Sequence, residues 1–202
     1  MPRETVSANI YQKMKPRLHR RIGRAIRLAG RVLDLGCGSC DLVRYLAATY
    51  AQRVTGVDIS PGSFPRRRVC GQRVRFRCLH RDAGRLEFAA DRSIDAVTMM
   101  WSLHEMDHPE GILAETRRVL RPGGEILIVD FPRGSLAQEL WNEDYYRPEE
   151  VKALLARAGF AEIRVRLIER QQVLWARARQ PLEAGAGTGR ESAHARKDPA
   201  TV

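Results

Sequence analysis

The sequence between residues 31 and 42 reads Arg31-Val32-Leu33-Asp34-Leu35-Gly36-Cys37-Gly38-Ser39-Cys40-Asp41-Leu42. Its first part is a short apolar run with the length and branching of a buried parallel strand. Gly36 and Gly38 then predict a tight turn, because glycine adopts positive φ easily and lets a ligand approach the backbone closely. The rest of the chain is arranged around this strand and turn.

A helix is expected directly after the turn. Ser39 has the side chain of a good N-cap, and residues 41–47 have the apolar spacing of a helix. Asp41 stands where the dinucleotide-binding pattern has its third glycine, so the segment departs from that pattern. A strand, a glycine turn and a helix N-terminus together are the start of a nucleotide-binding α/β unit.

A second strand at residues 53–57 ends at an acid, Asp58, about two dozen residues after Asp34. In this architecture a carboxylate at the tip of the second strand accepts hydrogen bonds from the hydroxyls of a ribose. The spacing therefore predicts a site for a nucleoside-containing cofactor at the carboxyl ends of the first two strands.

At this point the chain resembles the class I S-adenosylmethionine-dependent methyltransferases. Four segments match that family's motifs in the right order: the first motif at residues 32–38, the acid and small residue at 82–83, the entry to the fifth strand at 120–129, and a late helix end at 155–160. The match covers roughly residues 30 to 177. It is similar to the small-molecule, quinone-methyltransferase-like branch of the family.

The resemblance implies S-adenosyl-L-methionine as the cofactor and no metal. It implies that Asp58 holds the ribose, that Ile59, Asp82 and Ala83 frame the adenine, and that Tyr11 lies over the methionine end. The implied cofactor-binding residues are Tyr11, Asp34, Gly36, Cys37, Gly38, Asp58, Ile59, Asp82, Ala83 and Trp101. Asp34 and the two glycines would form the loop on the methionine side, and Trp101 either packs on the cofactor or belongs to the core.

The expected fold is a single α/β domain, a Rossmann-like doubly wound sheet of seven strands, mostly parallel with an antiparallel last strand. Residues 1–30 are predicted to be a basic amphipathic helical segment, 31–178 the cofactor-binding methyltransferase domain and 179–202 a disordered tail. Pro16 predicts two helices or a kink near residues 14–15 in the first segment, because proline lacks the N–H that a helix interior needs.

Methyl transfer from a sulfonium requires alignment of the acceptor and removal of its proton, with no covalent nucleophile. Residues 101–108, after the fourth strand at 94–100, would face the methyl group. His104 is the first candidate for a general base, because imidazole titrates near working pH; the alternative is a histidine that binds a loop carbonyl. Glu105 and Asp107 either bind a cationic acceptor, orient His104, or cap the helix that begins near Pro109.

The four cysteines, Cys37, Cys40, Cys70 and Cys78, show no spacing that predicts a disulfide framework. Cys37 and Cys40 resemble half of a metal or redox site, but Cys37 also lies in the cofactor turn, which is the interpretation we favour. The fourth strand lacks the Asn/Asp-Pro-Pro-aromatic ending of adenine, cytosine or glutamine N-methyltransferases. It also lacks the Pro-Cys pair of cytosine C5 enzymes, and the cysteine positions give no support for arsenite methylation.

The net charge of +11 comes almost entirely from arginine, with 35 Lys and Arg residues against 24 Asp and Glu. The basic residues of the N-terminal helix could meet nucleic acid or an anionic membrane surface, or could simply be solvated. No apolar run approaches the roughly 20 residues of a membrane span, and no secretory signal is recognisable, which together predict a cytoplasmic location.

The predicted function is methyl transfer from S-adenosylmethionine to a small molecule such as a quinone, phenol, amine or lipid head group. An aromatic cluster at residues 131–146 suits a planar acceptor. One alternative is an RNA methyltransferase, suggested by the basic charge. Another is a non-catalytic module that binds the cofactor.

Overall fold

The computed structural model describes residues 3–60, 64 and 76–182, and the side chains from residue 10 onward within those ranges. Cys70 and most of the predicted tail lie outside the described residues. No helix in the described ranges is both long and apolar enough to cross a membrane.

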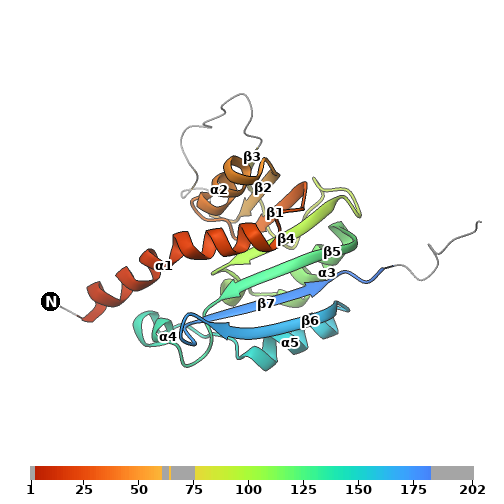
Figure 1. The fold of residues 1–202 in the computed structure, drawn as a ribbon. Coiled ribbons are helices and arrows are strands. Elements are labelled where there is room, and N and C mark those ends of the chain that lie inside the picture. The colour runs from red at the N-terminus through yellow and green to blue at the C-terminus, as the bar shows by residue number, and fades with distance from the viewer. Residues whose placement is uncertain (1–2, 61–63, 65–75, 183–202) are drawn as a thin grey trace, which may run out of the picture.

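Seven strands form one sheet in the order β3-β2-β1-β4-β5-β7-β6 (Figure 1). Its strands are β1 (Arg31–Leu35), β2 (Arg53–Asp58), β3 (Phe76–His80), β4 (Ile94–Met100), β5 (Leu120–Asp130), β6 (Ala161–Ile168) and β7 (Val173–Arg179). The pairings from β3 through β5 are parallel, whereas β7 is antiparallel to both of its neighbours. The predicted sheet, with an antiparallel strand that comes last in the chain, is confirmed.

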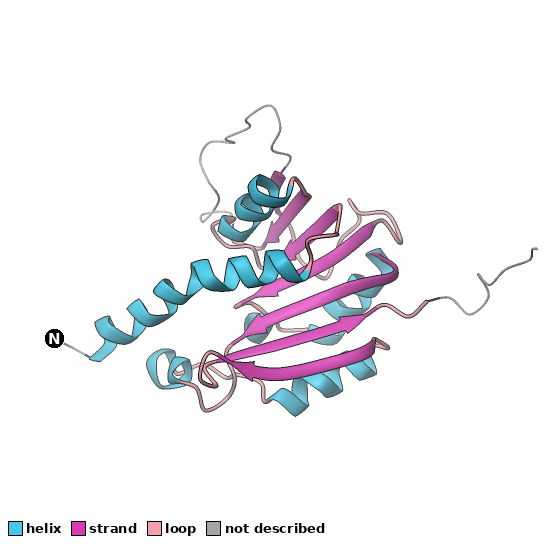
Figure 2. Ribbon diagram, viewed as in Figure 1, coloured by secondary structure: helices cyan, strands magenta, loops and turns pink. Residues whose placement is uncertain are grey.

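Helices cover both faces of this sheet (Figure 2). The helices are α1 (Arg3–Ala25), α2 (Asp41–Tyr50), α3 (Pro109–Val119), α4 (Leu136–Trp141) and α5 (Pro148–Arg157), with a short 3₁₀ helix η2 (Leu103–Glu105). One apolar core lies between the sheet and α1, α2 and α4, and a second lies between the sheet and α3 and α5. The β1, β2 and β4 strands are buried between these layers and are correspondingly apolar.

The N-terminal segment forms one helix, so the prediction of two separate helices was wrong. Pro16 lies inside α1 on its exposed side. The carbonyl that loses its N–H partner belongs to Gln12, which is also exposed, so water can satisfy it. Buried Leu18 and Ile22, both 0% exposed, hold the following turns against the sheet, and this packing outweighs the cost of the proline.

The start of α2 also differs from the prediction. Cys40, with φ 59°, is the N-cap, and no side chain caps this helix. Ser39 instead donates from its Oγ to Asp41 Oδ2 at 2.7 Å. Lys15 Nζ lies 2.9 Å from the same carboxylate oxygen and ties α1 to the start of α2. Ser39 therefore lies one residue before the N-cap, and its hydroxyl is oriented by Asp41.

Candidate active site

The glycine turn after β1 is fixed by two neighbouring strands. The N–H groups of Gly36 and Cys37 both donate to the Val57 carbonyl of β2, at 2.8 and 3.0 Å. Ser102, just after β4, donates from its Oγ to the Leu35 carbonyl at 2.8 Å. The turn is thus held between the carboxyl ends of β2 and β4, where open α/β sheets bind their ligands.

The two glycines of the turn experience different constraints. Gly36 has φ +71°, and a Cβ there would lie 2.3 Å from Ser102 Cβ. Gly38 has φ +48°, but no described atom lies within 4 Å of its Cβ position. Gly36 is therefore needed for folding, whereas Gly38 presents an open stretch of backbone toward the ligand side.

This difference predicts different outcomes for two matched substitutions. Gly36→Ala combines a left-handed backbone with a steric clash and should lower the free energy of unfolding by roughly 2–5 kcal/mol. Gly38→Ala should cost only about 1–2 kcal/mol, from the backbone conformation alone. Urea unfolding of the two variants measures the difference; equal losses would show that Ser102 moves aside freely.

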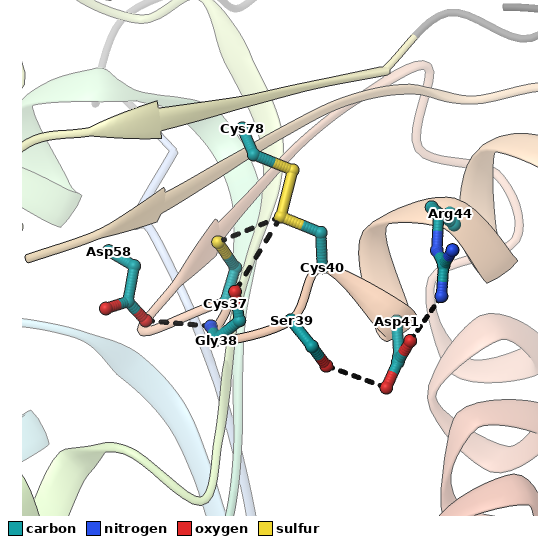
Figure 3. The surroundings of a disulfide bond; sticks show 8 residues. All are labelled: Cys37, Gly38, Ser39, Cys40, Asp41, Arg44, Asp58 and Cys78. Carbon is teal, nitrogen blue, oxygen red and sulfur yellow. Dashed lines mark hydrogen bonds and ion pairs between the residues drawn. A yellow bond between two sulfur atoms is a disulfide. The ribbon is translucent and has the colours of Figure 1, made fainter. Parts of the chain in front are cut away.

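Asp58 stands at the end of β2 and faces the turn. Its Oδ2 accepts a hydrogen bond from the Gly38 N–H at 2.7 Å (Figure 3). Its Oδ1 accepts one from the Ser60 N–H at 2.8 Å. Beside it opens a cleft of about 460 Å³ whose lining includes Gly36, Ile59, Asp82 and Ala83. Ile59 is 73% exposed, so the cleft offers an apolar surface next to a carboxylate.

Asp34 of β1 lies buried behind the turn, with 2% of its surface exposed. Its Oδ1 accepts a hydrogen bond from Thr98 Oγ1 of β4 at 2.6 Å. Burial raises the pKa of Asp34 to about 7, because water no longer stabilises its charge; the Thr98 hydrogen bond opposes this rise, and the charge of Asp58 adds to it. Asp34 is therefore able to gain or lose a proton near neutral pH.

Aromatic rings from three parts of the chain gather beside the turn and form what we call the ring cluster: Tyr11, Trp101, Phe131, Trp141 and Tyr145. Trp101 stacks on Phe131 with ring centroids 5.2 Å apart. Tyr11 contacts Phe131 edge-on at 4.8 Å and places its hydroxyl 3.1 Å from Gln172 Oε1. The indole nitrogen of Trp101 is buried and has no hydrogen-bond partner among the described residues.

His104 is held at the edge of the ring cluster by carboxylates. Its Nδ1 lies 2.7 Å from Asp130 Oδ1 at the end of β5, and its Nε2 lies 3.2 Å from Glu143 Oε2. The side chains of His104 and Asp130 are only 4% and 3% exposed, whereas that of Glu143 is 47% exposed. The ring thus joins a buried acid to one that reaches water.

The charge state of His104 is set by opposing effects. Burial alone lowers the pKa of an imidazole. Asp130 opposes this through its hydrogen bond and its charge, and the charges of Glu105 and Glu143 add to that effect. The result is a pKa of His104 above its usual value of 6.5. The polar contacts of the ring in the described part of the chain are to carboxylates, with Asp130 at Nδ1 and Glu143 and Glu105 at Nε2.

Two predictions about neighbouring residues were wrong. The N-cap of α3 is His108, so Glu105 and Asp107 do not cap this helix. No side chain caps it. The cysteines do pair: a disulfide joins Cys40 to Cys78 of β3. Parallel pairing brings β3 beside β2 and hence beside the turn, which spacing along the sequence does not reveal.

The predicted site residues fall into two adjoining groups. Gly36, Asp58, Ile59, Asp82 and Ala83 line the cleft. The others lie behind or beside the turn (Asp34, Cys37, Gly38) or in and around the ring cluster (Tyr11, Trp101, His104). The two groups meet at Glu105, a cleft residue whose Oε1 lies 3.9 Å from His104 Nε2.

The sequence prediction missed two members of this site, Asp130 and Glu143, and it placed Tyr145 in the aromatic cluster without relating it to His104. Asp130 was identifiable in principle, because it is an acid at the carboxyl end of a parallel strand, as Asp58 is. Glu143 and Tyr145 lie in the loop between α4 and α5. The direction in which that loop folds back toward His104 leaves no signal in the local sequence.

Comparison with known proteins identifies the framework. The family described as "Methyltransferase domain" matches residues 33–128, which span the glycine turn, Asp58 and the strands of the cleft. Over these residues the chain is similar to S-adenosylmethionine-dependent methyltransferases. The fold of the chain is similar to that of a SAM-dependent methyltransferase from Archaeoglobus fulgidus, with a TM-score of 0.68 and 18% identity over 83% of this chain and 93% of that one.

Two further relatives define how far the similarity reaches. The [4+2]-cyclase SpnF has a TM-score of 0.70 and 22% identity over 83% of this chain and 81% of its own. The ubiquinone/menaquinone biosynthesis C-methyltransferase UbiE of Desulfotalea psychrophila is 36% identical over 105 residues, which are 50% of this chain and 42% of that protein. The chain therefore spans less than half the length of that curated relative. The fold is shared even with a cyclase, so the acceptor must be argued from the site.

Proposed function

We propose that this chain transfers the methyl group of S-adenosylmethionine to a small planar molecule with a hydroxyl group, such as a phenol or a quinol. The observation that carries the proposal is His104, fixed by Asp130 beside the ring cluster and joined to the cofactor cleft through Glu105. This arrangement places a general base next to an apolar surface for a flat ring and next to a site for a nucleoside.

The residues present fit the cofactor. Asp58 accepts two backbone hydrogen bonds, yet each of its carboxylate oxygens has a second lone pair for a ribose hydroxyl. Gly38 leaves its backbone open, and the buried Asp34 supplies a carboxylate for the methionine ammonium group. Ile59, Asp82 and Ala83 would frame the base. The cofactor, when bound, supplies a methyl group already activated by its attachment to a positively charged sulfur.

The protein's part in the reaction is to orient the acceptor and remove its proton. Asp130 accepts a hydrogen bond from Nδ1 of His104, which leaves Nε2 as the basic nitrogen. A proton taken from an acceptor hydroxyl at Nε2 can pass to Glu143, which is 3.2 Å away and partly exposed to water. Loss of that proton makes the oxygen and the ring carbons of a phenol or quinol more nucleophilic.

The comparisons support the same class of acceptor. The Desulfotalea relative is named a C-methyltransferase of ubiquinone/menaquinone biosynthesis, and quinols are flat, apolar and carry the ionisable hydroxyl that His104 would serve. Within the ring cluster, Tyr11, Phe131 and Tyr145 are buried, whereas Trp141 is exposed and Trp101 partly exposed. The two indole rings would supply the surface for a flat acceptor. Such surfaces favour planar ligands over flexible head groups.

Calorimetric titration with S-adenosylmethionine and S-adenosylhomocysteine tests the cofactor site. Asp58→Ala should weaken binding about 10- to 100-fold, because it removes charged hydrogen bonds to both ribose hydroxyls. Asp91→Ala is the matched control, since that aspartate is 71% exposed and pairs with Arg118. A folded wild-type protein that binds neither ligand would contradict the proposal, and binding without turnover on any quinol would favour a non-catalytic module.

A further inference from the structure

Three sulfur atoms meet at the base of the cofactor turn. Cys37 and Cys40 belong to the turn and Cys78 to β3, and their Sγ atoms all lie within 4.8 Å of one another. A disulfide joins Cys40 to Cys78, and the Cys37 thiol lies 3.6 Å from Cys40 Sγ (Figure 3). Residues separated by 38 positions in the sequence are thus covalently joined beside the candidate active site.

A glycine in β2, Gly56, provides the space that these sulfur atoms occupy. Cys78 lies opposite Gly56 in the register between β3 and β2. A Cβ on Gly56 would lie 2.7 Å from Cys37 Sγ, so only a glycine at this position of the second strand admits the sulfur. The disulfide therefore reaches across β2, the strand that ends at Asp58.

This position links the disulfide to the cofactor turn. Cys40 is the N-cap of α2 and follows Gly38 by two residues, and Gly38 is the residue whose N–H binds Asp58. The turn is held at its start by the hydrogen bonds to Val57 and at its end by the bond to Cys78. Without the disulfide, only non-covalent contacts would fix the end of the turn, and ordering it around a ligand would cost conformational entropy.

The surroundings favour the uncharged form of the Cys37 thiol. Burial, with the charges of Asp34 and Asp58, holds the pKa of the Cys37 thiol well above its usual range. Cys40 is completely buried, whereas Cys78 is partly exposed. Cys78 is therefore the sulfur that an external thiolate can attack, and a disulfide is a neutral way to occupy a buried site beside two carboxylates.

We propose that the Cys40–Cys78 disulfide is a reversible redox site that sets the affinity of the turn for the cofactor, with a small or protein dithiol as the reductant. In reduction, one dithiol sulfur bonds to Cys78 Sγ as the Cys40–Cys78 bond breaks, and Cys40 leaves as a thiolate that takes up a proton. The second dithiol sulfur then displaces Cys78, which is also protonated, and the dithiol ends as a cyclic disulfide. The inference rests on the proposed function, because the affinity in question is that for S-adenosylmethionine.

The experiment compares oxidised and reduced forms of the full chain. Peptide mapping without reductant should find Cys40 and Cys78 cross-linked, and dithiothreitol should open the link reversibly. Calorimetry with S-adenosylhomocysteine should give about tenfold weaker binding to the reduced form, the equivalent of ordering about one additional backbone residue. Cys78→Ser should show the weak affinity with no response to dithiothreitol, whereas Cys70→Ser, the control, should keep the wild-type response.

The outcomes separate this inference from the proposed function. Equal affinity in the two redox states would show a static cross-link and overturn the switch alone. Absence of binding in both states would contradict the proposed function and the switch with it. Zinc bound stoichiometrically by the reduced protein would assign the three sulfur atoms to a metal site instead. If Cys78→Ser fails to fold by circular dichroism, the reduced wild-type protein supplies the same comparison.

Discussion

Asp34→Asn is expected to make the cofactor-free protein more stable at pH 8 while abolishing S-adenosylmethionine binding. The gain should be on the order of 4 kcal/mol at pH 8 and should disappear near pH 4. Thermal unfolding across this pH range measures the gain, and calorimetry measures the loss of binding. Opposite effects of one substitution on stability and on binding would mark Asp34 as a functional residue that the fold tolerates at a cost.

The sign of this effect follows from the raised pKa of Asp34. The pKa moves from 3.8 in the unfolded chain to about 7 in the folded protein. Between these values the folded protein keeps a proton that the unfolded chain releases, so stability falls as pH rises from about 4 and the full penalty is present above about 7. Asparagine keeps an oxygen for the Thr98 hydroxyl and carries no charge, so it avoids the penalty.

Binding should show the complementary pH dependence. If the Asp34 carboxylate receives the methionine ammonium group, affinity rises with pH until Asp34 is ionised, near pH 7. Thr98→Val is the matched control: it removes the hydrogen bond that lowers the pKa of Asp34, and it should move the midpoint to higher pH. An Asp34→Asn variant with wild-type affinity, or one whose stability gain over the wild-type protein is the same at pH 5 and pH 8, would contradict this role for the Asp34 carboxyl.

The sequence was sufficient to predict the sheet because its local signals agree with one another. The apolar strand at Val32–Leu35, the glycine turn and the acid at Asp58 each predict the same α/β unit, and parallel strands place their carboxyl ends at one edge. The cleft residues could be predicted for the same reason. The helix through Pro16 could not, since tertiary packing of Leu18 and Ile22 decided it against the local preference.

The rest of the site depends on contacts that spacing does not encode. The Cys40–Cys78 bond requires β3 to lie beside β2 in a particular register. The pairing of His104 with Asp130 requires η2 to fold against the end of β5, 26 residues away. Each residue alone has an ordinary explanation, and only their proximity gives them a chemical role.

His104→Gln is expected to lower kcat for a quinol acceptor by about 10²- to 10⁴-fold with little change in cofactor affinity, because the variant cannot take the hydroxyl proton. The assay follows transfer of a labelled methyl group from S-adenosylmethionine to a naphthoquinol that lacks a ring methyl. An unchanged kcat would show that His104 is structural and that the acceptor loses its proton to solvent.

The pH profile distinguishes a base from a structural histidine. The wild-type rate should rise with pH as His104 loses its proton, with a midpoint above 6.5, because Asp130, Glu105 and Glu143 raise its pKa. Asp130→Asn removes one of these charges and should move the midpoint down, while also disturbing the tautomer held at Nδ1. Glu143→Gln leaves the Nδ1 partner in place and should shift the midpoint less.

Loss of Asp130 and loss of Glu143 should therefore affect His104 in different ways. Asp130 is a positioning residue: it also accepts hydrogen bonds from the backbone N–H groups of His104 and Phe131, at 3.1 and 2.8 Å, so its loss should lower kcat by more than the pH shift explains. Glu143 is partly exposed and serves as the exit for the proton, so its loss should be rescued by small buffer bases. Rescue of Glu143→Gln but not of Asp130→Asn is the result expected if the proton leaves from Nε2 of His104 toward water.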